Sequence, residues 1–171
     1  FQYEILNMID EGYLVGVEQY LVKIESLDLS RCRITAGDLH GSDLAEILEQ
    51  EKPLLGMADA TLKTVGGKKT LVFAHSVNQA ERMAEIFNRH RPGSADCVFG
   101  HTPDAKRQEV FKRFSDDRLQ ILVNVGVAGE GYDNPRIEAV VCARPTRSRA
   151  RYTQQIGRGL RPLEGVIDGL G

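Results

Sequence analysis

Apolar and polar positions between residues 68 and 156 follow two alternating patterns. Four short apolar runs have the length and composition of strands buried on both faces: 70–74, 96–99, 119–123 and 137–142. Helices are predicted between and after these runs, at 77–90, 104–114 and 148–156. Because alternating strands and helices need crossover connections, we predict an α/β fold in which helices cover both faces of a parallel sheet.

Local signals mark where two of these helices begin. Ser76 is followed three residues later by Gln79, which is the spacing of a capping box. Thr102 precedes Pro103 and an acidic residue, so we predict that Thr102 is an N-cap with proline at the first helical position.

The first part of the chain has a weaker pattern. Residues 17–26 mix apolar and charged positions and are predicted as a strand, and residues 27–41 are polar and rich in turn formers. Ser42 is predicted to cap a short helix, which is followed by a second helix at 53–65. We divide the chain into an acidic N-terminal appendage, residues 1–62, and a main domain, residues 63–171.

Composition narrows the class of protein. The chain has 171 residues and 42% hydrophobic residues, enough for a buried core, and no run long and apolar enough to cross a bilayer. It begins without methionine and resembles a piece of a longer protein. Its three cysteines are far apart and lack metal-ligand spacing, so we expect free thiols in a reducing cytosol and no metal site. We also expect no membrane partner.

Charge is distributed unevenly along the chain. The formal net charge is −2, yet acids predominate up to residue 62, and residues 144–161 carry six arginines and no acid. We call residues 144–161 the arginine strip. A local basic strip on a nearly neutral chain predicts a phosphate-bearing partner on one surface.

The end of the arginine strip has a spacing that suits an anion. Gln154, Arg158 and Arg161 share one helical face if the helix continues, and two guanidinium groups can bind several phosphate oxygens. The alternative is a solvated basic helix end that complements the helix dipole.

Three loops follow predicted strands, where open parallel sheets bind ligands. His75 and Ser76 lie before one helix, and Gly100 and His101 lie before another. Each loop is either a simple helix cap or a cap whose amides also bind phosphate.

The third loop, residues 124–135, contains three glycines. Their Gly-x-x-Gly-x-Gly order reverses the dinucleotide fingerprint, and Pro135 prevents a long helix, so a Rossmann cofactor site fits poorly. Asp133 either accepts hydrogen bonds from a ribose or is a turn residue.

Residues 71–76, 123–135 and 154–161 resemble motifs IV, V and VI of superfamily-two helicases, with the greatest similarity to type III restriction-enzyme helicase subunits and DEAD/DEAH-like DNA repair translocases. The resemblance covers residues 68–162 and implies a second, C-terminal RecA-like motor domain. It implies that Arg158 and Arg161 reach the γ-phosphate of ATP on a partner domain, beside Gln154, and that Gly131 and Asp133 contact the nucleotide. The residues that it assigns to the nucleic-acid backbone are His75, Ser76, Gly100, His101, Val125 and Gly126.

The chain also departs from this family. Many relatives have threonine where this chain has Val125, and the usual last strand is not recognisable in residues 163–171. The chain lacks the Gly-x-x-x-x-Gly-Lys-Ser/Thr loop and the Asp-Glu pair that hold ATP and Mg²⁺, so both are expected on an upstream RecA-like domain.

The leading hypothesis is therefore the second motor domain of an ATP-dependent helicase or translocase, cytoplasmic or nucleoid-associated, with DNA favoured over RNA. The alternatives are a non-catalytic nucleic-acid-binding module that uses the arginine strip, and a small-molecule enzyme with a glycine-rich cofactor loop.

Overall fold

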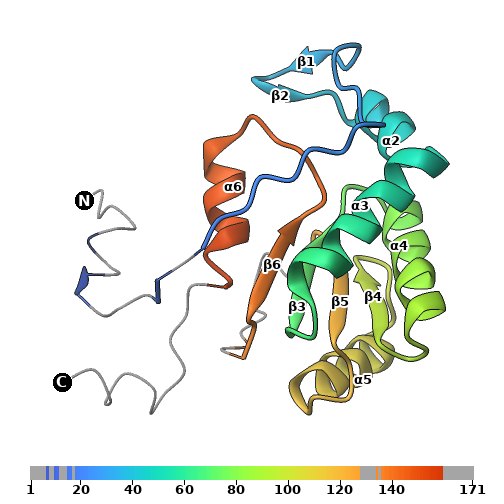
Figure 1. The fold of residues 1–171 in the computed structure, drawn as a ribbon, viewed down its shortest axis with the longest axis vertical. Coiled ribbons are helices and arrows are strands. Elements are labelled where there is room, and N and C mark those ends of the chain that lie inside the picture. Colours follow the sequence, from blue (N-terminus) through green and yellow to red (C-terminus); the bar gives the residue numbers. More distant parts are fainter. Residues whose placement is uncertain are drawn as a thin grey trace.

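The computed structural model describes residues 7, 10–11, 15–16, 18–127, 134 and 136–159. In chain order, its elements are β1 (Ile34–Thr35), β2 (Asp38–Leu39), α2 (Gly41–Leu48), α3 (Glu51–Val65), β3 (Thr70–Phe73), α4 (Val77–His90), β4 (Ala95–Phe99), α5 (Asp104–Ser115), β5 (Ile121–Val125), β6 (Ala139–Cys142) and α6 (Arg149–Ile156). Figure 1 shows the sheet between α5 at one end of the molecule and the β1–β2 hairpin at the other.

The main sheet is parallel throughout and has the strand order β4-β5-β3-β6. Phe73 at the end of β3 pairs with Asn124 in β5 and with Cys142 at the end of β6, so the carboxyl ends of the strands reach one common edge. The sequence prediction of a parallel sheet with alternating helices is confirmed.

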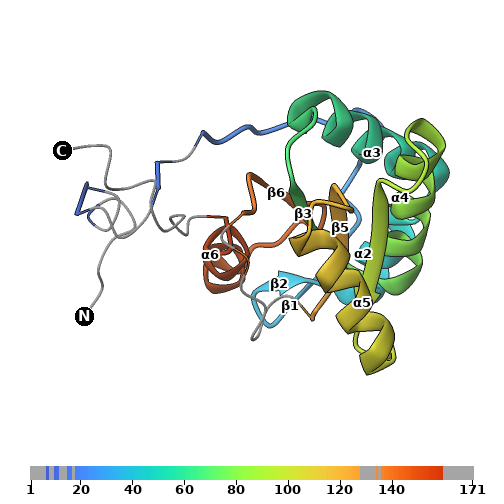
Figure 2. The ribbon, with the colours of Figure 1, turned by 90° about the horizontal axis from the view of Figure 1, so that it is seen from below.

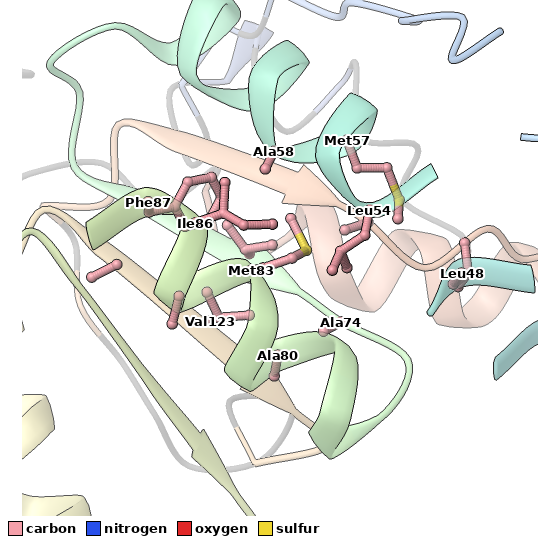
Figure 3. Close-up of a cluster of buried hydrophobic side chains, with 14 of the residues drawn as sticks. Leu48, Leu54, Met57, Ala58, Ala74, Ala80, Met83, Ile86, Phe87 and Val123 are labelled. Carbon is pink, nitrogen blue, oxygen red and sulfur yellow. The ribbon is translucent and has the colours of Figure 1, made fainter. Parts of the chain in front are cut away.

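Side chains pack on both faces of this sheet, as expected for strands without an exposed face. Val72 and Val123 belong to one cluster with side chains of α3 and α4, and Figure 3 shows part of it. Leu71 and Leu122 belong to a second cluster, which includes Phe114 of α5. The alternation of Leu71 and Val72 between the clusters follows the two-residue period of a strand.

The appendage does not have the predicted strand at 17–26. Residues 18–26 form no strand, because the edges of the main sheet pair with no part of this segment. Instead Gln19 bonds the Tyr152 hydroxyl at 2.9 Å, and Ile24 packs closely against Gly56 of α3. The segment therefore contacts α6 and α3 without joining a sheet.

Two predicted helix caps are wrong. His40 is the N-cap of α2, and Ser42 lies within its first turn, with its Oγ 3.1 Å from His40 Nδ1. Pro103 is the N-cap of α5, because the Thr102 hydroxyl accepts a hydrogen bond from the Phe99 amide and closes the preceding turn.

Helix α3 confirms the helix predicted at 53–65, and it joins α2 in the cluster that packs against the sheet. The predicted division after residue 62 falls inside α3, and it stays a prediction. None of the helices within the described ranges has the length and apolar character needed to cross a membrane.

Candidate nucleotide and nucleic-acid interface

The loops after β3, β4 and β5 meet at the carboxyl edge of the sheet. Pairing of β4 with β5 runs to Phe99 and Val125, and β3 ends beside Asn124. The structure therefore brings together His75 and Ser76, Gly100 and His101, and Val125 and Gly126, as the sequence predicted for a common ligand-binding edge. We call this edge the loop rim.

Ser76 begins α4 as predicted. Its Oγ accepts a hydrogen bond from the Gln79 amide at 3.1 Å, and the Gln79 side chain accepts one from the His75 amide at 2.7 Å. This differs from the usual capping box, in which the side chain at the third helical position bonds the amide of the N-cap residue itself. Here that side chain bonds the amide of the residue before the N-cap.

A carboxylate also occupies this helix start. The oxygens of Glu49, which follows α2, lie 2.5 Å from Ser76 Oγ and 2.5 Å from Asn78 Nδ2. A negative group here complements the α4 dipole, as a phosphate would. The start of α4 is therefore already neutralised by a carboxylate of the chain itself.

His75 is half-buried behind Ser76. Its Nε2 lies 2.7 Å from the Gly41 carbonyl oxygen, so Nε2 carries the proton and Nδ1 is left as an acceptor. Burial lowers the pKa of His75; the Gly41 bond opposes this effect, and Arg144 adds to it. His75 is therefore a neutral imidazole whose ring nitrogens both face the protein, because Nε2 donates to Gly41 and Nδ1 is buried.

The second loop is held by Arg107. Its guanidinium donates to the carbonyl oxygens of Gly100 at 3.2 Å and Thr102 at 3.0 Å. Gly100 and His101 remain exposed at the surface. Arg107 thus fixes the backbone of this loop while its outer side stays accessible to a ligand.

The third loop leaves β5 through Gly126, whose φ of +71° favours glycine because it has no Cβ. Asn124, just before it, is buried and donates to the Val72 carbonyl at 2.9 Å, which ties β5 to β3 at the rim. Gly131 and Asp133, predicted to contact the nucleotide, lie outside the described residues.

Helix α6 carries the described part of the nucleotide motif. Ser148 caps it by accepting from the Arg151 amide at 3.3 Å. Gln154 is exposed on the helix, and Arg158 is half-buried in the turn that follows it. Arg161 lies outside the described residues, so one of the two predicted arginines is placed.

The end of α6 lies beside β6 and away from the loop rim. A Cβ built on Gly159 would meet Val140 Cγ2 at 2.6 Å, so the backbone next to Arg158 packs directly on β6. The predicted site residues thus form two groups: the loops at the rim, and Arg158 on the flank that β6 provides.

The start of α6 is bound by the appendage, as Figure 2 shows for the hairpin and α6. Asp38 in β2 accepts from Thr146 Oγ1 at 2.9 Å, from the Arg147 amide at 2.7 Å and from Arg151 Nη1 at 2.5 Å. Sequence reasoning missed Asp38 and Glu49, because the partners of these acids on the main domain lie 27 to 113 residues away.

No group of His, Cys, Asp and Glu side chains suited to a metal ion occurs among the residues that the structure describes. Cys32, Cys97 and Cys142 are free thiols, and burial raises the pKa of both Cys97 and Cys142 to about 11. Cys97 and Cys142 are therefore protonated packing residues at neutral pH.

Comparison with known proteins identifies the family. Residues 53–162 match the family described as Helicase conserved C-terminal domain. Two yeast proteins named as putative ATP-dependent helicases are similar: IRC3 of Saccharomyces cerevisiae, 31% identical over 164 residues and 92% of this chain, and irc3 of Schizosaccharomyces pombe, 32% identical over 165 residues and 95% of this chain. The chain spans 23% and 27% of their lengths.

A solved structure supports the same fold. The DEAD box protein of Methanococcus jannaschii aligns with a TM-score of 0.55 at 20% sequence identity, over 61% of this chain and 29% of that one. The four-stranded parallel sheet and its helices match a RecA-like helicase domain. The chain belongs to the helicase conserved C-terminal domain family.

Proposed function

We propose that this domain is the second motor domain of an ATP-dependent nucleic-acid helicase or translocase. The observation that carries the proposal is the separation of two surfaces on one rigid sheet: three loops at the carboxyl rim, and α6 with Arg158 along β6. A motor domain needs such a separation, because one surface must bind the nucleic acid while another contacts the bound ATP.

ATP and Mg²⁺ are held by an upstream RecA-like domain in this proposal. Arg158 and Arg161 reach the γ-phosphate when the two domains close, and Gln154, Gly131 and Asp133 line the nucleotide. An arginine delivered from outside neutralises charge on the transferred phosphoryl group and accelerates its transfer by about three to five powers of ten. Hydrolysis therefore requires closure.

The loop rim holds the nucleic-acid backbone. Gly100 and His101 support this assignment, because both are exposed in the loop that follows β4. Contacts from hydroxyls, imidazoles and backbone amides to phosphates read no bases, so binding is independent of sequence. We propose DNA as the substrate, from the resemblance to DNA repair translocases.

The test is Arg158→Ala in the full-length protein. We expect ATP turnover to fall by about a thousandfold, while the dissociation constant for a DNA oligonucleotide changes less than about twofold. Dissociation constants measured for this DNA and for an RNA of identical sequence show which of the two substrates is bound more tightly. Unchanged turnover would reject the arginine role.

The rival function is a nucleic-acid-binding module that uses the arginine strip. Arg151 of this strip pairs with Asp38, and Arg144 is half-buried, with its pKa lowered by burial and by Arg151. A face built for phosphates would leave these guanidiniums accessible. If Arg158→Ala removes DNA binding and leaves turnover intact, the module is the correct function.

A further inference from the structure

The β1–β2 hairpin delivers one carboxylate to the start of α6. Its two-residue turn, Ala36 and Gly37, has φ values of 50° and 81°, the left-handed conformation that matches the twist of paired strands. Asp38 is the first residue after this turn and pairs with Thr35. The turn therefore determines where Asp38 lies.

Asp38 is saturated with hydrogen-bond donors. Oδ1 accepts from the Leu39 amide at 2.9 Å and the Arg147 amide at 2.7 Å, and Oδ2 accepts from Thr146 and Arg151. The Asp38 side chain is 16% exposed, so solvent weakens these bonds little. Charge-assisted bonds to both oxygens define the position of the segment that enters α6.

The base of the hairpin is held by α2. Asp43 accepts from the Arg33 amide at 3.0 Å, from Arg33 Nε at 2.8 Å and from Arg33 Nη2 at 2.7 Å. Helix α2 in turn packs into the main core through Leu44 and Leu48. The hairpin thus forms a bracket between the core and the first turn of α6.

The other end of α6 is held by β6. Gly159 packs on Val140 with no room for a Cβ, and Arg158 is its neighbour in the chain. Between Arg151 and Arg158 the chain advances by about two helical turns. A shift at the Asp38 end would therefore tilt α6 about the Gly159 contact and change the direction in which Arg158 points.

We propose that Asp38 is a positioning residue, which holds α6 so that Arg158 meets the γ-phosphate on closure of the two motor domains. This inference rests on the proposed function. A displacement of about 1 Å at a reacting group can reduce a rate by about a hundredfold, so a bracket far from the nucleotide has a large effect on turnover.

The test uses Asp38→Asn and Asp38→Ala in the full-length protein with saturating DNA. Asparagine keeps one acceptor oxygen but turns an NH₂ toward the donors of Oδ2, so it retains part of the contact. We expect kcat for ATP to fall by about tenfold in Asp38→Asn and further in Asp38→Ala. The KM for ATP and the dissociation constant for DNA should change by less than about twofold.

A second measurement tests the contacts of Asp38 with the start of α6 directly. Amide hydrogen exchange of residues 145–152 should accelerate in both Asp38 variants, because the Arg147 amide loses its carboxylate acceptor. The matched control is Asp59→Asn, which breaks an exposed pair with Lys63 on α3 at 2.7 Å and should change neither exchange of this segment nor kcat.

Two results would overturn the inference, and they can be distinguished. If Arg158→Ala slows ATP turnover but Asp38→Ala leaves kcat unchanged, Asp38 does not position the arginine, and the proposed function stands. If Arg158→Ala leaves turnover unchanged, the proposed function fails and the positioning role fails with it, even where exchange of residues 145–152 accelerates.

Discussion

Gly159 is the residue at which backbone packing and the candidate nucleotide site meet. The space that a Cβ would need is occupied by Val140 Cγ2 at 2.6 Å, well inside normal contact distance. A short, branched valine side chain cannot swing aside as a long flexible one would. Any larger residue at position 159 must therefore push the chain away from β6 and carry Arg158 with it.

Gly159→Ala should lower both stability and turnover. Forcing a methyl group into this contact costs about 1–3 kcal/mol, the range for overpacked sites. Val140→Ala removes the obstructing methyl, so the double variant should recover ATP turnover relative to Gly159→Ala alone. Gly67→Ala is the control, because a Cβ there meets no atom within 4 Å. Failure of Val140→Ala to restore any turnover would contradict the steric account.

His75 makes stability depend on pH near neutrality. Its folded pKa is lowered by burial, so the unfolded chain, with a pKa of about 6.5, takes up a proton at higher pH than the folded chain does. The contribution is complete above pH 6.5 and decreases as pH falls toward the folded pKa. His75→Gln should flatten the decline in unfolding free energy between pH 7.5 and 5.5, measured by urea titration. An equally steep decline in the variant would show that other groups cause it.

At the scale of helices and strands, the sequence pattern predicted correctly those features that depend on contacts between residues close together in the chain. Ser76 and Gln79 identified the start of α4 because both partners lie within one helical turn. The contacts of Asp38 and Glu49 with the main domain could not be predicted this way, since no spacing rule connects an acid to a partner 27 or more residues distant. The strand predicted at 17–26 was wrong for the same reason. The composition of this segment suits a strand, but neither edge of the main sheet pairs with residues 18–26.

Two serines near helix starts provide a direct test of capping. Ser76→Ala should lower the unfolding free energy by about 1 kcal/mol, since the Gln79 amide loses its acceptor. Ser42→Ala should change it by less than about 0.5 kcal/mol, because Ser42 lies inside α2 and caps nothing. Urea unfolding of both variants measures the difference. Equal losses would mean that the sequence-based cap at Ser42 was right after all.

At the scale of the whole molecule, the sheet keeps two groups of residues apart. The loops after β3, β4 and β5 gather at the rim, and α6 runs along β6 between the Asp38 and Gly159 contacts. Both groups are anchored to the same core, in which β3 and β5 pack against α3 and α4. Under the proposed function, this arrangement lets a nucleic-acid-binding rim and Arg158 move together on closure of two motor domains.

This separation predicts that the two functions can be lost independently. His101→Ala removes an exposed side chain at the rim, so the DNA concentration for half-maximal ATPase should rise by about fivefold, as expected for a contact of about 1 kcal/mol. Its kcat at saturating DNA should match that of the wild type. Arg158→Ala should do the reverse, lowering kcat at an unchanged DNA requirement. His90→Ala, at the exposed far end of α4, should alter neither quantity. A kcat loss in His101→Ala that saturating DNA does not relieve would mean that the rim and the β6 flank form a single site.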